Sequence, residues 1–312
     1  DGEASPCVRR LGGVVHERAI LRVHGWAVER TTHSAAQHQQ PLPARAEAYL
    51  GRNVETYRVV TGVLDRRLVS VVGPGGVGKS AVAIAAINYL AERHYFSDGV
   101  LYVDCSAARD METLGAQLRA RLLTPETTEL PSPRASPELG NPALAAMRAA
   151  IAPLQGLHCL LVLDGVHSDL LADEGPLVTE FLSLLLSFAR VRTLLTAVSP
   201  VAQPLQGGAE KVVDIRPLSK INTARLLCRL SPRPLLLSEI EGAGSAADFV
   251  QRLSQHELIE GFAGNPGLVK AAAPRLSHLK LPELHKEQLA QLQTRPSRAP
   301  PRMTVADRFE LD

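Results

Sequence analysis

Hydrophobic residues along the chain follow two patterns, short continuous apolar runs and longer segments with helical spacing. The apolar runs predict buried strands and cover residues 67–72, 99–105, 159–163, 191–196 and 211–215. The segments with helical spacing cover residues 54–63, 80–93, 111–123, 143–152 and 178–188. Strands that alternate with helices are typical of an α/β fold, in which helices cover both faces of a parallel sheet.

The pattern changes after Pro217, beyond which only helical spacing remains. Helices are expected at residues 221–230, 246–260 and 266–276. We therefore expect an α/β domain at 41–216 and a small all-helical subdomain at 217–293. Residues 1–40 mix charged and polar side chains with short apolar pieces, which predicts an N-terminal extension or the end of a preceding domain. Residues 294–312 are rich in Pro and Arg and are expected to form a tail.

Composition and charge exclude several classes of protein. Apolar residues make up 45% and charged residues 21%, as in ordinary globular proteins, and a net charge of +2 gives no reason to expect nucleic acid or a membrane surface as a partner. The longest apolar run, 181–189, is too short to span a bilayer. The four cysteines, Cys7, Cys105, Cys159 and Cys228, lack the spacing of a metal site. Cys105 and Cys159 lie in apolar runs, which predicts buried thiols in a reduced, cytoplasmic protein.

A glycine-rich segment follows directly on the strand expected at 67–72. It reads Gly73-Pro74-Gly75-Gly76-Val77-Gly78-Lys79-Ser80 and matches the P-loop pattern G-x-x-x-x-G-K-[ST]. Its glycines let successive N–H groups point inward around an anion, and the next helix adds its positive N-terminal end. We expect Lys79 to reach the β- and γ-phosphates, Ser80 to ligate Mg²⁺ and Ala81 to adjoin the nucleotide. Residues 41–216 are therefore expected to be a P-loop nucleotide-binding domain.

A second element of such a site is the strand at 159–163, which ends in Asp164. A carboxylate at this position beside a P-loop typically holds Mg²⁺ through water, so Asp164 is the second expected metal residue. Many such ATPases carry another acid next, to orient the attacking water, but this chain has Gly165, which has no side chain for that task. His167 is a weak candidate for a catalytic base, and no catalytic residue is otherwise indicated.

Six segments together resemble the NB-ARC branch of the STAND signalling ATPases, also called the AP-ATPase family. They are Tyr-Leu-Gly-Arg at 49–52, the P-loop at 73–80, the strand and Asp at 160–164, Leu-Leu-Thr at 194–196, Arg-Pro-Leu-Ser at 216–219 and Gly-Asn-Pro-Gly-Leu at 264–268. The resemblance covers about residues 46–280. The P-loop is common to a whole superfamily, whereas the flanking segments point to this branch.

The resemblance implies a nucleotide-operated switch that binds ATP or ADP with Mg²⁺. ADP holds the closed state, and exchange for ATP permits assembly with protein partners, through flanking domains or by self-assembly. The resemblance also implies that Leu50, Gly51 and Arg52 lie near adenine and that Pro266 packs against the base from the helical side. Adenine rather than guanine rests on this resemblance alone.

The sequence departs from the family pattern in three places. Gly165 replaces the second acid, Val198 stands where an arginine senses the γ-phosphate, and no winged-helix subdomain follows before residue 312. We therefore expect weak or absent hydrolysis. Two alternatives stay open, an active ATPase with a base from His167 or another subunit, and an interaction scaffold with a structural nucleotide. A P-loop kinase would need an acceptor site and a lid of arginines, which we do not find.

Overall fold

The computed structural model describes residues 41–122, 142–201, 205 and 210–294 of the 312-residue chain. The expectations for residues 1–40 and for the tail beyond Thr294 fall outside the described residues. Among the described residues, no helix has both the length and the apolar character needed to cross a membrane.

Five parallel strands form one sheet, as the apolar runs predicted. They are β1 (Leu68–Val72), β2 (Val100–Asp104), β3 (Leu160–Val166), β4 (Arg192–Ala197) and β5 (Glu210–Asp214), in the order β2-β3-β4-β1-β5. All neighbouring strands run parallel, so their carboxyl ends meet at one edge of the sheet. This edge is where ligands bind in open α/β sheets.

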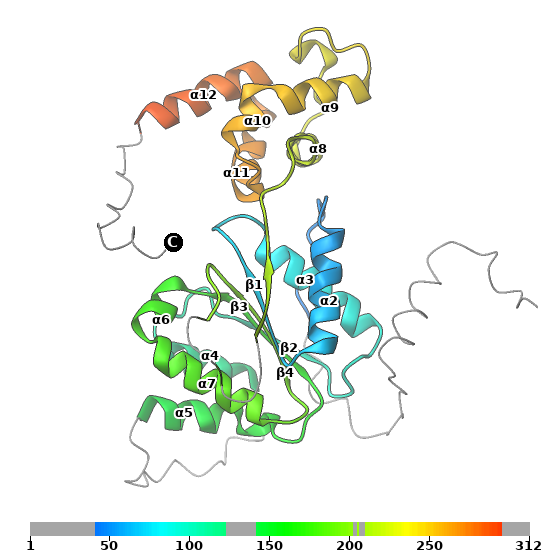
Figure 1. Cartoon of the computed structure of the whole chain (residues 1–312). Coiled ribbons are helices and arrows are strands. Elements are labelled where there is room, and N and C mark those ends of the chain that lie inside the picture. The colour runs from blue at the N-terminus through cyan, green and yellow to red at the C-terminus, as the bar shows by residue number, and fades with distance from the viewer. Residues whose placement is uncertain (1–40, 123–141, 202–204, 206–209, 295–312) are drawn as a thin grey trace, which may run out of the picture.

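Helices cover both faces of the sheet, which confirms the expected fold class (Figure 1). One face packs against α2 (Asn53–Asp65) and α3 (Lys79–Glu92), and the other against α4 (Met111–Leu122), α5 (Pro142–Ile151) and α7 (Gly175–Ser187). Alternate strand residues therefore enter different cores, so that Leu194 faces α2 and α3 whereas Leu195 faces α4 and α7. Cys105 and Cys159 are buried free thiols as predicted, and burial raises the pKa of each to about 12.

A helical region with its own core follows the sheet and lies beyond the carboxyl ends of the strands (Figure 1). It comprises α8 (Lys220–Leu230), α9 (Ala246–Gln255), α10 (Glu257–Gly261), α11 (Pro266–Ala272) and α12 (Leu281–Thr294), with 3₁₀ turns at Leu237–Glu239 and Ala273–Ser277. Its placement puts the P-loop, at the end of β1, directly opposite the helical region.

Three details of this region differ from the sequence expectation. The single helix expected at 246–260 is wrong, because the chain turns at His256, whose side chain accepts a hydrogen bond from the backbone N of Leu258 and begins α10. The helix expected at 266–276 ends at Ala272 and continues as a 3₁₀ turn. The sequence reading also named no helix at α12, nor at α6 (Ser168–Asp173) in the α/β domain.

Candidate functional site

The P-loop joins β1 to α3 and ends in a glycine with left-handed backbone. Gly78, the residue before α3, has φ of 102°, and no side chain caps the helix. The first-turn N–H groups of α3 are therefore available to an anion. The start of the loop is fixed to the end of β4, because Gly73 N donates to the carbonyl of Val198 at 3.3 Å.

Lys79 bends back over the loop that precedes it. Its Nζ donates to the carbonyl oxygens of Gly73 at 2.8 Å and Pro74 at 3.0 Å. Burial lowers the pKa of Lys79, and the negative charge of Asp164 opposes that shift. The ammonium group and the carboxylate therefore lie close enough to interact, as a P-loop lysine and a Mg²⁺ carboxylate should.

Asp164 is buried near the end of β3, with both carboxylate oxygens hydrogen-bonded. The hydroxyl of Tyr102, on β2, donates to Oδ2 at 2.6 Å, and that of Thr196, on β4, donates to Oδ1 at 2.6 Å. Burial and the hydrogen bond to Asp164 raise the pKa of Tyr102 well above its ordinary value, so this hydroxyl stays a donor. An ionised carboxylate has about four acceptor positions, so both oxygens can also take a magnesium-bound water.

A β-bulge explains why glycine follows Asp164. The register between β3 and β4 shifts between Leu163 and Val166, and Gly165 N donates to the hydroxyl of Thr196 at 2.7 Å. Gly165 has φ of 78°, and a Cβ there would lie 3.2 Å from the Cβ of Ser106. A glutamate at this position would therefore need a strained backbone as well as space that the neighbouring loop occupies.

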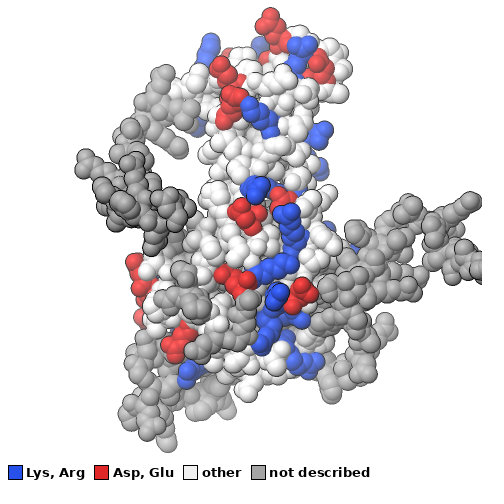
Figure 2. Space-filling view, viewed as in Figure 1, with Lys and Arg blue, Asp and Glu red and all other residues white. Residues whose placement is uncertain are grey.

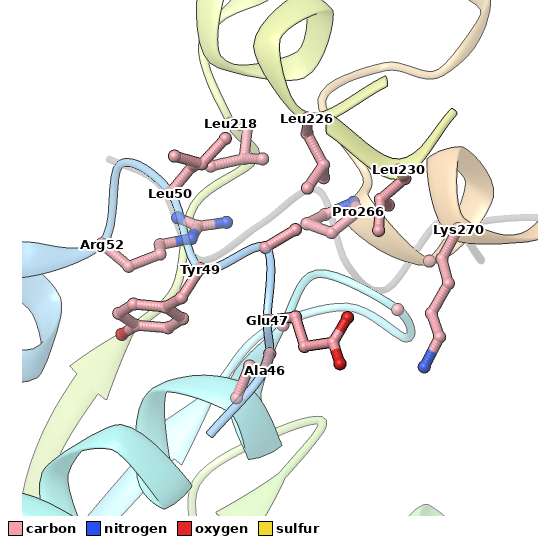
Figure 3. Close-up of a pocket in the computed structure, with 15 residues that line it drawn as sticks. Ala46, Glu47, Tyr49, Leu50, Arg52, Leu218, Leu226, Leu230, Pro266 and Lys270 are labelled. Carbon is pink, nitrogen blue, oxygen red and sulfur yellow. The ribbon is translucent and has the colours of Figure 1, made fainter. Parts of the chain in front are cut away.

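A pocket of about 420 Å³ lies between the P-loop and the helical region (Figure 3). It is lined by residues 46–50 and Arg52 before α2, by Gly76, Gly78 and Ala81, and by Leu218, Leu226, Leu230, Pro266, Gly267 and Lys270 of the helical region. In Figure 3 Leu226, Leu230 and Pro266 form one apolar wall, and Leu50 lies beside Leu218 at another. The charged ends of Glu47 and Lys270 lie on one side of the pocket. Apolar walls beside a P-loop suit a nucleotide base.

The start of α11 is hydrogen-bonded directly to the P-loop. Asn265 Nδ2 donates to the carbonyl of Gly75 at 2.9 Å, and Gly267 N donates to the carbonyl of Gly76 at 2.9 Å. The same Asn265 caps α11, since its Oδ1 accepts from Gly267 N at 2.9 Å. A Cβ on Gly76 would come within 2.6 Å of Asn265 Oδ1, so only glycine allows this close approach. We call these two bonds, to Gly75 and Gly76, the P-loop latch.

Arg52 connects three parts of the site from a buried position, with only 5% of its surface exposed. Its Nη2 donates to the carbonyl of Val77 in the P-loop at 2.9 Å, and its Nη1 to the carbonyl of Arg216, between β5 and α8, at 2.7 Å. Nη1 also pairs with Glu55 of α2 at 3.0 Å. Arg52 thus holds the segment before α2, the P-loop and the entry to the helical region together.

Comparisons with known proteins found similar solved structures, all at low sequence identity. No family model and no curated protein matches the chain. A STAND protein with a tetratricopeptide repeat sensor from Pyrococcus horikoshii is similar in structure, with 14% identity and a TM-score of 0.46 over 80% of this chain and 33% of that chain. A Walker-type ATPase of Pyrococcus abyssi is 16% identical, with a TM-score of 0.49 over 80% of this chain and 74% of that chain. The ORC2 protein of Aeropyrum pernix is 15% identical, with a TM-score of 0.43 over 81% of this chain and 70% of that chain. The chain spans about a third of the length of the first of these.

The chain has the P-loop NTPase fold. Its own features carry this conclusion, a P-loop between β1 and α3 in a parallel sheet of order β2-β3-β4-β1-β5.

Some of the other residues that the sequence singled out line the pocket, and others do not. Leu50, Arg52, Gly76, Gly78, Ala81 and Pro266 line the pocket, whereas Gly51, Pro74, Gly75, Val77 and Ser80 are not among its lining residues. His167 caps α6, because its Nδ1 accepts a hydrogen bond from the backbone N of Asp169 at 3.2 Å. One of its two ring nitrogens is therefore already hydrogen-bonded. Val198 lies directly after β4 with its side chain half exposed.

Sequence reasoning missed several residues that the structure brings to the site. Tyr102 and Thr196 hold Asp164, and Glu47 and Lys270 adjoin the pocket. Thr196 and Asn265 lie within segments that the family resemblance quoted, so their place in those segments could have marked them. Tyr102 gave no signal beyond its place in an apolar run.

On the face shown in Figure 2, acidic and basic side chains are interspersed, and neither sign gathers in one patch.

Proposed function

We propose that the chain is an ATP/ADP-binding switch of the NB-ARC type, in which the nucleotide controls assembly with protein partners through the position of the helical region. The observation that carries this proposal is the pocket between the P-loop and the helical region, together with the P-loop latch. A nucleotide whose phosphates lie in the P-loop and whose base enters this pocket would contact both parts of the chain at once.

Adenine fits the apolar walls of the pocket. Leu50 approaches from the segment before α2, and Leu226 and Pro266 from the helical region, so the base would be enclosed between the two. Stacking against apolar side chains recovers the free energy of removing the base faces from water. Base contacts therefore favour the arrangement of the helical region that the structure shows.

Mg²⁺ would be held by the hydroxyl of Ser80 and, through water, by the carboxylate of Asp164. Both are oxygen donors, which Mg²⁺ prefers, and Asp164 retains acceptor capacity beyond its two hydrogen bonds. The ion would offset the charge of the β- and γ-phosphates, to which Lys79 contributes a second positive charge.

Weak or absent hydrolysis follows from the surroundings of Asp164. The bulge at Gly165 leaves no side chain where a second acid would orient water, and the capping hydrogen bond of His167 occupies one of its ring nitrogens. The apolar Val198 after β4 offers no donor to a γ-phosphate. A chain with these features is suited to retain a nucleotide rather than to turn it over.

Calorimetric titration with Mg-ADP and Mg-ATP tests the proposal. We expect both to bind, with similar affinity, and Lys79→Ala to abolish or strongly weaken binding. Lys286→Ala, which removes an exposed lysine on α12, is the matched control and should bind as the unmodified chain does. No binding by protein free of co-purified nucleotide would refute the switch. A phosphate-release assay in which the unmodified chain exceeds Lys79→Ala would favour the alternative, an active ATPase.

A further inference from the structure

Tyr102 reaches the magnesium side of the site from a neighbouring strand. In the register of β2 and β3, Tyr102 lies opposite Val162 and Asp104 lies opposite Asp164. The Tyr102 ring packs against the core shared with α3, and its hydroxyl extends to Asp164 Oδ2 at 2.6 Å. The contact thus joins β2, which carries no P-loop motif, to the expected Mg²⁺ carboxylate.

Asp164 is held from both sides of its own strand. Thr196, fully buried on β4, donates to Oδ1, while Tyr102, on β2, donates to Oδ2. Both distances, 2.6 Å, are typical of strong bonds from a hydroxyl to an ionised carboxylate. Because each oxygen has its own donor on a different strand, the plane of the carboxylate is fixed and rotation about its terminal bond would break both bonds.

The two donors also determine which parts of the carboxylate remain open. Each takes one lone pair of its oxygen, which leaves the other for a magnesium-bound water. Residues that orient metal-binding groups in this way commonly change metal affinity when they are replaced. A purely structural tyrosine, in contrast, would affect folding and every form of nucleotide equally.

We propose that Tyr102 is a positioning residue for Mg²⁺, which fixes the Asp164 carboxylate together with Thr196 and thereby makes nucleotide affinity depend on Mg²⁺. This inference rests on the proposed nucleotide binding. It assigns Tyr102 to the coupling between the ion and the nucleotide rather than to the binding of the phosphates themselves.

The test compares ADP affinity in Mg²⁺ with ADP affinity in EDTA, by calorimetry on the whole chain. Tyr102→Phe keeps the ring and removes only the hydroxyl. We expect its ADP affinity in EDTA to stay within about twofold of that of the unmodified chain. The dissociation constant in EDTA divided by that in Mg²⁺ should fall about tenfold, or to one if this ratio is below ten in the unmodified chain. Thermal unfolding in EDTA without nucleotide checks that the variant is folded.

Tyr89→Phe is the matched control, because Tyr89 packs against the same core from α3 and contacts Arg93 rather than Asp164. It should keep the original ratio. An unchanged ratio in Tyr102→Phe, or an equal loss of affinity in Mg²⁺ and EDTA, would overturn the inference and leave the proposed function intact. A failure of the unmodified chain to bind ADP at all would overturn both.

Discussion

Replacement of Arg52 by alanine should destabilise the chain far more than replacement of another arginine in the same segment. Arg52 is buried and donates to Val77 O and Arg216 O, whereas Arg45, seven residues earlier, forms an ion pair with Glu92 in which the side chains are 46% and 59% exposed. The two substitutions delete the same side chain from environments that differ chiefly in access to water.

The magnitude follows from what Arg52→Ala leaves behind. Hydrogen bonds from a charged donor contribute about 1.5–3 kcal/mol each, and two backbone carbonyls would lose such a donor. Glu55, whose side chain is 18% exposed, would lose its ion-pair partner. Since Arg52→Ala also removes the cost of burying the guanidinium, the net loss should be about 3–5 kcal/mol, as for other buried pairs broken on one side. Arg45→Ala should cost at most about 1 kcal/mol.

Equilibrium urea unfolding followed by circular dichroism measures both values. With a slope near 3 kcal/mol/M, the Arg52→Ala midpoint should fall by about 1 M or more, and the Arg45→Ala midpoint should hardly move. Arg52→Lys should fall between them, because one ammonium group is a point charge and does not reproduce the planar fork that serves both carbonyls. Equal midpoints for Arg52→Ala and Arg45→Ala would refute the role assigned to Arg52.

Three further substitutions test other parts of the structure. Gly165→Glu should lower the free energy of unfolding by about 2 kcal/mol, because a φ of 78° is costly for any residue with a side chain. It should not create ATP turnover, and phosphate release above that of the unmodified chain would contradict this. Asn265→Ser keeps a helix cap but loses the bond to Gly75, so the ADP dissociation constant should rise about fivefold in calorimetry, and an unchanged value would speak against the P-loop latch. The hydrogen bonds from Arg233 lower the pKa of Glu239 from 4.5 to about 2, so its stabilisation is complete above pH 4.5 and is lost as pH falls towards 2. The difference in unfolding free energy between the unmodified chain and Glu239→Gln should therefore shrink by about 3 kcal/mol over that range, and a constant difference would refute it.

The strands and the P-loop were predictable because their signals are local. Parallel strands covered on both faces are mostly apolar, and β1 and β3 are accordingly rich in Val and Leu, while β4 carries Leu194 and Leu195 between two threonines. The P-loop pattern fixes its own conformation through glycine and the helix that follows. These features depend on few distant residues, so periodicity and motif located them to within a few positions.

The break at His256 and the place of Arg52 were not predictable in the same way. Nothing in the sequence around His256 stops a helix, and the turn depends on its cap to Leu258 and on its ring contact with His285 of α12, 5.0 Å between centroids. The family resemblance placed Arg52 near the base, but its bonds join segments 25 and 164 residues away. Such contacts form only in the assembled fold. The helix α12, in contrast, had a local signal that the sequence reading missed. Pro282 lies in its first turn, and the buried Leu281 and Leu284 lie three positions apart.

The pocket draws its walls from three stretches of chain that the sequence separates widely, residues 46–52, 76–81 and 218–270. An unfolded chain cannot offer such a binding surface, so a ligand that enters the pocket binds the folded state alone. By mass action, free nucleotide at a hundred times its dissociation constant would add about 2.7 kcal/mol to the free energy of unfolding. Resistance to heat and to proteases would then rise with nucleotide concentration. The amount of protein that remains folded would therefore depend on the concentration of free nucleotide around it.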